Sequence, residues 1–303
     1  MSFDVSVVCS CRNDNYGENL LDRLYYFIRS VDRFTIPIEI IIVEWNPLEN
    51  YESMFDIISR WNALVPFQHP VRIITVSKDN HERFIGKFKF ETQCNSFQEY
   101  PAKNVGIRRA KGTHILQTNP DIFFPVETIK FIENLITTTD ITSVITAGAP
   151  RGKRVDLLEI NHFPSIINAS SSMDITNGLN NMEQLVLQPK YIKIVNECAL
   201  GDFMLFKKDR AHVTKSFKEY PIAIHHHEQP FVDEFKKIGL HETPIKGITI
   251  YHFDHSRVSY EKVNEHAKIN PISVTLEYLR SVQNDNNWGC NDLQLSESVI
   301  SAQ

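Results

Sequence analysis

The sequence has no hydrophobic run long enough to cross a membrane. Its longest apolar stretches, such as residues 40–43, are far shorter than the roughly 20 residues that a membrane-spanning helix needs. The amino-terminal segment carries an acidic residue, Asp4, among apolar ones, and it lacks the basic segment and the cleavage site of a secretory signal peptide. We therefore expect a cytoplasmic protein without a transmembrane segment.

Cysteine is scarce and scattered. Cys9 and Cys11 lie two residues apart, which is neither the CxxC spacing of a redox site nor, without a second pair, the spacing of a zinc site. The remaining cysteines are Cys94, Cys198 and Cys290. We expect reduced thiols, as in a reducing compartment.

Neither sign of charge is in large excess. The 303 residues contain 32 Lys and Arg against 37 Asp and Glu, a formal net charge of −5. This balance argues against a nucleic-acid partner, because such binding depends on a surplus of basic residues. The sequence also lacks GxxxxGK(S/T), GxGxxG and GxSxG, which excludes a phosphate-binding loop, a dinucleotide fingerprint and a serine-hydrolase elbow. A nucleotide would have to bind at the edge of a sheet.

What the chain has instead is a regular alternation of apolar patterns. In the first half, short and almost continuously apolar segments alternate with helical stripes of apolar residues. The predicted strands are residues 4–11, 38–43, 71–76 and 114–118, and the predicted helices are residues 18–34, 54–64 and 101–110. This order predicts an α/β fold with a mostly parallel central sheet covered by helices on both faces.

The second half of the sequence is less regular. Residues 151–190 are rich in Asn, Ser and Gly, so we expect loops and short elements there. Further along, we predict strands at 203–206 and 247–252 and helices at 230–238 and 274–282. The final eight residues, from Ser296, are expected to fray.

Polar segments follow the predicted strands of the first half. Because the carboxyl ends of parallel strands meet at one edge of a sheet, where ligands of such sheets bind, these segments form a candidate site. They are residues 10–15, 44–47, 77–80 and 119–121. Glu44 ends an apolar strand and is suited to accept hydrogen bonds from a base or a ribose, although an acid there can also cap a helix or face solvent.

Residues 101–112 contain a predicted helix with features of an anion site. Gly106 inside a helix costs about 1 kcal/mol relative to alanine, so we expect a close backbone approach at this position. Lys103 and Asn104 lie in the first turn, where free N–H groups and the helix dipole favour an anionic or polar ligand.

Two further groups of residues are suited to bind a cation. Residues 119–121, Asn-Pro-Asp, follow a buried strand and precede an apolar run, where an acid is costly unless it is paired or metal-bound. Their carboxylate and amide oxygens suit a hard divalent cation. His252 and His255, at a strand end, could both ligate a metal, or neither. A triple histidine at 225–227, followed by Glu228, could equally be a solvated loop.

Six stretches of the chain, taken together, resemble a known family. They are VSVVCSCRND at 5–14, EIIIVEWNP at 39–47, AKNVGIRRAKG at 102–112, TNPDIF at 118–123, ALGDFML at 199–205 and YHFDH at 251–255. In this order they resemble the glycosyltransferases of the GT-A fold, in the broad family-2-like group. The resemblance covers the chain from Asp4 to about His255.

The resemblance implies a domain organisation and a nucleotide-sugar donor, with a UDP-sugar as the first choice. A GT-A domain would cover residues 1–260, with a nucleotide-sugar-binding half at 1–125 and an acceptor-side half at 126–260, and a helical extension and tail would follow at 261–303. In the donor site, Ser10, Arg12 and Glu44 would line the nucleoside pocket. Lys103 and Asn104 would lie near the ribose or the diphosphate.

The resemblance also implies a metal site. Asn119 and Asp121 look like a variant of the family's DxD motif, with Asn in place of the first acid. Asp121 would ligate a divalent cation, Mn²⁺ or Mg²⁺, that bridges the diphosphate. His252 or His255 is similar in position to the family's carboxy-terminal histidine ligand, and His255 is the preferred choice.

Glu228 falls where the family has its general base, and Asp202 would border the acceptor. The resemblance therefore implies a metal-assisted, inverting transfer of a hexose to a hydroxyl of a glycan or another acceptor. The alternative is a non-catalytic nucleotide- or carbohydrate-binding protein that keeps the fold, which the Asn at position 119 favours. A nucleotidyltransferase would need a glycine-rich loop, which residues 11–15 lack. Trp288, in the tail, is a further candidate for closing the site.

Overall fold

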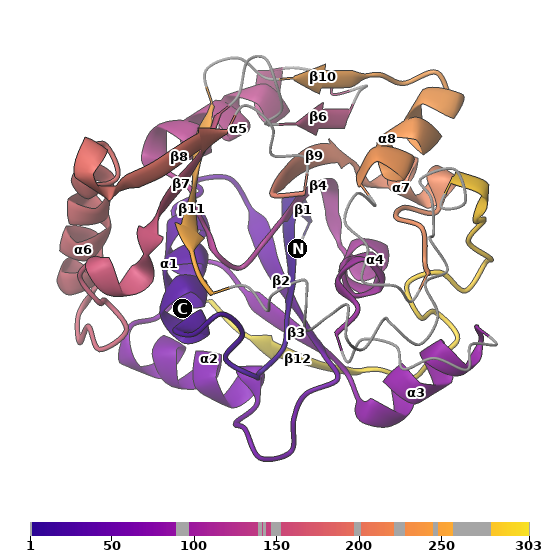
Figure 1. Ribbon diagram of the computed structural model, residues 1–303, viewed down its shortest axis with the longest axis horizontal. Coiled ribbons are helices and arrows are strands. Elements are labelled where there is room, and N and C mark those ends of the chain that lie inside the picture. Colours follow the sequence, from indigo (N-terminus) through magenta and orange to yellow (C-terminus); the bar gives the residue numbers. More distant parts are fainter. Residues whose placement is uncertain are drawn as a thin grey trace.

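The computed structural model describes residues 2–88, 97–138, 141, 144–146, 153–196, 201–220, 228–244, 248–256 and 280–302. Its main sheet has eight strands in the order β10-β6-β9-β4-β1-β2-β3-β12, and a second sheet has the order β5-β11-β7-β8 (Figure 1). The fold is mixed α/β with a central, mostly parallel sheet flanked by helices, which confirms the predicted fold class.

The centre of the main sheet is the parallel unit expected from the first half of the sequence. It consists of β1 (Phe3–Cys11), β2 (Ile38–Trp45), β3 (Val71–Val76) and β4 (Gly112–Thr118). In β2, Ile40 and Ile42 pack into one core cluster, whereas Ile41 and Val43 pack into another. Both faces of the strand are therefore covered, which is why the strand sequence is apolar without alternation.

The helices of the first half cover these two faces. They are α1 (Leu20–Val31), α2 (Met54–Leu64), α3 (Lys78–Gly86) and α4 (Glu99–Arg109), with α1 and α2 on one side of the sheet and α4 on the other (Figure 1). Gly106 explains the close packing of α4, because a Cβ there would lie 2.5 Å from Val8 Cγ1. The close approach predicted at Gly106 is thus to a neighbouring strand. The sequence did not predict α3, which begins within the expected loop 77–80.

The second half is more regular than expected. Its elements are β5 (Ile122–Phe123), α5 (Val126–Thr138), β6 (Val144–Thr146), β7 (Lys153–Glu159), α6 (Ser172–Leu185), β8 (Ile192–Asn196), β9 (Phe203–Lys207), α7 (Lys208–Thr214), α8 (Glu228–Lys237), β10 (Glu242–Pro244) and β11 (Thr249–Asp254). The strands expected at 203–206 and 247–252 and the helix expected at 230–238 correspond to β9, β11 and α8. No helix in the described part of the chain combines the length and the apolar character of a membrane span.

The expectation of loops and short elements across 151–190 is wrong. This stretch contains β7 and the fourteen-residue helix α6, whose amino terminus is capped by Ser171, which accepts a hydrogen bond from the backbone N–H of Asp174. Only Ile175, Leu179 and Met182 of this helix are buried. So narrow an apolar stripe in a polar sequence is a weak periodic signal, which is why the pattern missed the helix.

The expectation that the last eight residues fray is also wrong. Residues Ser296–Ile300 form β12, which pairs antiparallel with β3 and closes that edge of the main sheet (Figure 1, yellow). Most of the helix predicted at 274–282 lies outside the described residues. The domain boundary at residue 260 stays a prediction.

Arg72 on β3 fastens this edge strand to the sheet. Its guanidinium lies 2.6 Å from Glu39 Oε2 and 3.0 Å from Glu297 Oε2. Glu39 is fully buried and also accepts the hydroxyl of Ser6 at 2.6 Å. The ion pair therefore compensates a carboxylate that has no access to water.

We predict that Arg72→Met lowers the free energy of unfolding by about 3–5 kcal/mol, because it leaves the charge of Glu39 buried and unpaired. Arg60→Met is the matched control, since Arg60 pairs with Glu52 at the surface and its loss should cost at most about 1 kcal/mol. Urea unfolding of both variants measures the difference. Equal losses in the two variants would contradict this account.

Candidate active site

The candidate site lies where the main sheet meets the second sheet. The chain leaves β4 through Asn119 and Asp121 and enters β5, which pairs antiparallel with β11. In this register His252 lies opposite Ile122, and the backbone N–H of Phe253 donates to the carbonyl of Asp121 at 3.0 Å. Pairing between two short strands thus brings residues from distant parts of the sequence together.

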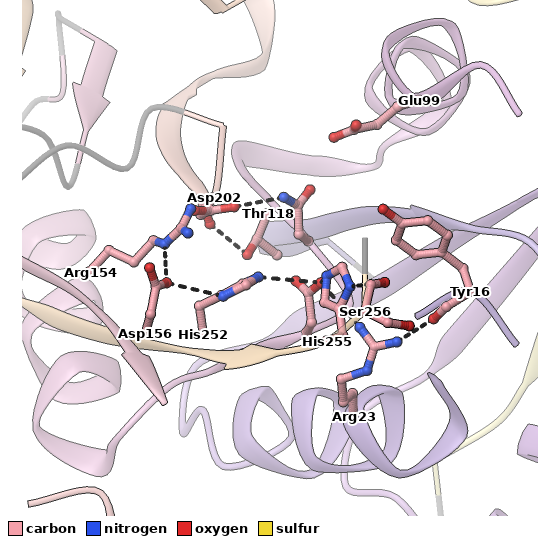
Figure 2. Close-up of polar contacts among 12 residues, drawn as sticks. Tyr16, Arg23, Glu99, Thr118, Arg154, Asp156, Asp202, His252, His255 and Ser256 are labelled. Atoms are coloured by element: carbon pink, nitrogen blue, oxygen red, sulfur yellow. Dashed lines mark hydrogen bonds and ion pairs between the residues drawn. The ribbon is translucent and has the colours of Figure 1, made fainter. Parts of the chain in front are cut away.

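Asp121, His252 and His255 form a cluster that could hold a metal ion (Figure 2). Asp121 Oδ2 lies 3.1 Å from His255 Nε2 and 3.6 Å from His252 Nε2. Two atoms bound about 2.1 Å from a shared cation are about 3.0–3.4 Å apart, for right-angle to tetrahedral geometry. The distance from Asp121 to His255 fits a common ion, and His252 lies slightly further away. Ligand atoms of all three side chains lie within 4.8 Å of one another.

The two imidazoles are oriented as metal ligands usually are. His252 Nδ1 lies 3.1 Å from Asp156 Oδ1, and His255 Nδ1 lies 3.2 Å from the carbonyl oxygen of Ser256. His255 Nδ1 thus has a hydrogen-bond partner in this carbonyl, and Asp156 lies beside Nδ1 of His252 as a charged neighbour. In both rings Nε2 is the nitrogen that lies near Asp121. Asp156 is a functional candidate that the sequence analysis missed.

Asp121 itself is buried and still has an oxygen to offer. Burial alone would raise its pKa, but the neighbouring His252 and His255 hold that pKa well below its usual range. Burial likewise lowers the pKa of His252, and Asp121 and Asp156 outweigh this effect and raise it to about 9. Among the described residues, no hydrogen-bond donor reaches Asp121 Oδ1. An ionised carboxylate with an unpartnered buried oxygen fits a cation site.

The loop between β1 and α1 covers one side of this cluster. A Cβ on Gly17 would lie 2.5 Å from His255 Nδ1, and Gly17 has φ +69°, so a larger residue is excluded there. The ring of Tyr16 lies edge-on to that of His255, with centroids 5.2 Å apart. Arg23 of α1 donates to the carbonyls of Tyr16 and Glu18. The loop is therefore fixed against the cluster.

Arg23 also contacts the cluster directly. Its side chain is 1% exposed and lies 3.4 Å from Asp121 Oδ2. The same side chain thus fixes the loop and neutralises part of the charge of Asp121. The periodicity of the predicted helix at 18–34 places Arg23 among its polar residues. The sequence analysis therefore did not name Arg23 as a candidate site residue.

Asp202, predicted to border the acceptor, is held by ordered contacts. Asn119 Nδ2 donates to Asp202 Oδ1 at 2.7 Å, and Arg154 Nη1 lies 2.5 Å from Asp202 Oδ2. Arg154 also reaches Asp156 Oδ1 at 2.7 Å. Arg154 and Asp156 are two residues apart on β7 and point to the same side, a pattern that strand alternation could have flagged.

Glu228, the predicted base, lies at the start of α8 against the amino-terminal turn of α4. The hydroxyl of Tyr100 donates to Glu228 Oε1 at 2.5 Å. A Cβ on Gly201 would lie 2.5 Å from that oxygen, so the carboxylate packs against backbone that carries no side chain. Lys103 is fully buried beside it, with Nζ 2.6 Å from Glu99 Oε1 and 3.4 Å from the carbonyl of Gly201. The histidines at 225–227 lie outside the described residues.

Two of the predicted nucleoside-pocket residues lie at the ends of β1 and β2. Burial raises the pKa of Glu44, whose carboxylate accepts the backbone N–H of Met54 at 2.9 Å. Of the alternatives, a helix-capping contact is therefore the one present. Arg12 Nε donates to the carbonyl of Asn46 at 2.8 Å. The hydroxyl of Ser10 is buried, and no described residue hydrogen-bonds to it.

Two other expected residues make their contacts around α4. Asn104 is fully buried, donates to the carbonyl of Phe217 at 2.8 Å and accepts the N–H of Phe217 at 3.0 Å. Trp288 packs on the guanidinium of Arg108 and the ring of His212. Among the described residues, Asn104 and Trp288 thus contact groups that pack around α4.

A surface hollow of about 370 Å³ adjoins the cluster. It is lined by Asp156, Lys193, Ile194, Asp254 and His255. The cluster can therefore be approached from the side of the second sheet, and a ligand in the hollow would contact His255.

Comparison with known proteins gives only distant structural likenesses. No family model and no curated protein matches the sequence. The fold is similar to S. aureus TarS 1–349, at a TM-score of 0.46 and 13% identity over 89% of this chain and 64% of that one. It is similar to the mannosyltransferase PcManGT from Pyrobaculum calidifontis in complex with GDP-Man and Mn²⁺. The TM-score is 0.46 and the sequence identity 13%, over 88% of this chain and 61% of that one. It is also similar to S. aureus TarS 1–349 in complex with UDP-GlcNAc. The TM-score is 0.43 and the sequence identity 13%, over 89% of this chain and 65% of that one. The chain spans less than two thirds of each of these structures.

We predict that Asp156→Asn lowers the affinity for Mn²⁺ by about 10–100-fold, because the carboxylate that orients His252 and raises its basicity is lost. Titration followed by electron paramagnetic resonance of free Mn²⁺ measures this affinity. Asp209→Asn, an exposed change of the same kind on α7, is the control and should bind as the wild type does. Unchanged affinity in Asp156→Asn would contradict the orienting role.

Proposed function

We propose that this protein is a metal-assisted glycosyltransferase that moves a hexose from a nucleotide sugar, with a UDP-sugar as the first choice, to an acceptor hydroxyl. The observation that carries the proposal is the cluster of Asp121, His252 and His255. It lies at the carboxyl edge of a parallel sheet, where ligands of α/β folds bind. The motifs that resemble GT-A glycosyltransferases support the same assignment.

The cation would be held by one carboxylate and two imidazoles. Nitrogen ligands suit first-row transition ions better than Mg²⁺, which prefers oxygen, so we propose Mn²⁺ as the cofactor. When bound, it supplies positive charge that stabilises a departing diphosphate. Ser10 and Arg12 would line the nucleoside side, and the unpartnered buried hydroxyl of Ser10 is a hydrogen-bonding group available for a ligand.

Glu228 is proposed as the general base of an inverting displacement. Tyr100 holds Oε1, which leaves Oε2 to take the proton of the acceptor hydroxyl. The oxygen of the acceptor hydroxyl forms a bond to the anomeric carbon as the bond from that carbon to the diphosphate breaks, and the diphosphate leaves with the bonding pair. Lys103, buried and cationic near Gly201, adds positive charge on the side of α4.

A second candidate function is a non-catalytic binding protein that keeps the fold. Asn119 favours it, because the amide stands where the DxD motif has its first acid and is turned toward Asp202. The two functions differ in turnover and not in ligand binding. They are therefore tested in separate steps.

We expect UDP or GDP together with Mn²⁺ to raise the melting temperature, and each alone to raise it less. Saturation at about 100 times the dissociation constant stabilises a protein by about 2.7 kcal/mol, a shift of several degrees. Asp121→Ala should abolish the shift because the only carboxylate of the cluster is removed, whereas Asp209→Ala should keep it. A shift that survives Asp121→Ala would contradict the proposed cation site.

We expect Glu228→Gln to lower the rate of UDP release from UDP-sugars by about 10²–10⁴-fold while leaving affinity for UDP and Mn²⁺ within about threefold, because the base acts on the acceptor and not on the donor. Release is followed in a coupled assay with water or simple glycosides as acceptors. Glu234→Gln, on the same helix, is the control. Intact donor binding without turnover in the wild type would favour the non-catalytic alternative.

A further inference from the structure

The last residue of β4 and the residue that follows it, Thr118 and Asn119, hold Asp202 in place. β4 and β9 pair antiparallel with Thr118 opposite Phe203, so the residue before β9 comes beside the end of β4. The hydroxyl of Thr118 donates to the backbone carbonyl of Asp202 at 2.7 Å, and the amide of Asn119 donates to its Oδ1 at 2.7 Å (Figure 2). The backbone and the side chain of Asp202 are thus both fixed from the carboxyl end of β4.

The other oxygen of Asp202 begins a path to the cation cluster. Arg154 bridges Asp202 Oδ2 at 2.5 Å and Asp156 Oδ1 at 2.7 Å, and Asp156 in turn lies 3.1 Å from His252 Nδ1. Asp202 is 6% exposed and Asp156 is 8% exposed. In so little solvent these contacts are strong and leave each member little freedom to move.

The charge of these groups explains why residue 119 is an amide. An aspartate at 119 would point a second carboxylate at Asp202 Oδ1, where a donor now lies at 2.7 Å. Two carboxylates at that distance, one of them buried, repel each other. The amide of Asn119 instead supplies the N–H that an ionised Asp202 needs.

We propose that Asn119 is a positioning residue for Asp202 and not a metal ligand, and that Asn119, Asp202, Arg154 and Asp156 form one polar chain that ends on His252. Asparagine at this position is then a requirement of the site and not a weakened acid. The proposal rests on the proposed function only in taking the cluster at its end as the cation site.

A swap of amide and acid tests the contact itself. Asn119→Asp should lower the melting temperature at pH 8 by roughly 3 °C or more. Adding Asp202→Asn should recover at least half of that loss, because Asn at 202 can donate to Asp at 119 and still accept from Arg154. Asn180→Asp, an exposed change on α6 with the same added charge, should leave the melting temperature unchanged.

Binding of Mn²⁺ alone tests the assignment to the cation site. Asn119→Ala should keep the affinity within about threefold, since no ligand is lost, whereas Arg154→Met should lower it about tenfold by freeing Asp156 and His252. The proposal is overturned by an Asn119→Asp protein as stable as the wild type, by a swap that recovers nothing, or by a loss in Asn119→Ala as large as in Asp121→Ala. Neither measurement uses a nucleotide sugar, so absence of transfer would overturn the proposed function and leave this result standing.

Discussion

The candidate site depends on the antiparallel pairing of β5 with β11. β5 has only two residues, yet it fixes the register in which His252 lies opposite Ile122, next to Asp121. A shift by one residue would turn His252 to the other face of the strand and replace it with an apolar side chain. The second sheet thus has a clear role, since it delivers two imidazoles to the edge of the first.

The surroundings of the cluster keep its ligands in one orientation before any ion binds. Asp156 Oδ1 lies 3.1 Å from His252 Nδ1, the carbonyl of Ser256 is a hydrogen-bond partner of His255 Nδ1, and the loop containing Gly17 packs against His255. Side chains held in this way lose little further freedom on binding, so more of the binding free energy is retained. This arrangement costs folding free energy at two groups. The guanidinium of Arg23 is buried, and among the described residues Asp121 Oδ1 has no hydrogen-bond partner.

The sequence predicted those parts of the molecule whose pattern is local. Apolar strands such as residues 38–43 are recognisable because both faces are buried, and the ends of those strands define the candidate edge. Asp121, His252 and His255 were named from motif resemblance, and the structure brings these three together. Asp156 and Arg154 were not predictable in the same way, because the meaning of an acid on β7 depends on which strand pairs with it. Glu44 shows the converse, since its pattern allowed a ligand-binding or a capping role. The contact with Met54 shows the capping role, and the ligand-binding role stays a prediction.

The balance of charge around the cluster has a consequence for the kind of ligand it suits. Three buried carboxylates, those of Asp121, Asp156 and Asp202, are faced by two guanidinium groups, those of Arg23 and Arg154. When a cation has replaced the proton of His252, both imidazoles are neutral and these protein groups together carry one net negative charge, which favours a cation but does not build up strong repulsion. A divalent cation would reverse the sign to a single positive charge, and an anionic group such as a diphosphate would then be attracted to the same place. A second acid at position 119 would cancel that reversal, so the amide found there is consistent with a site that binds cation and anion together.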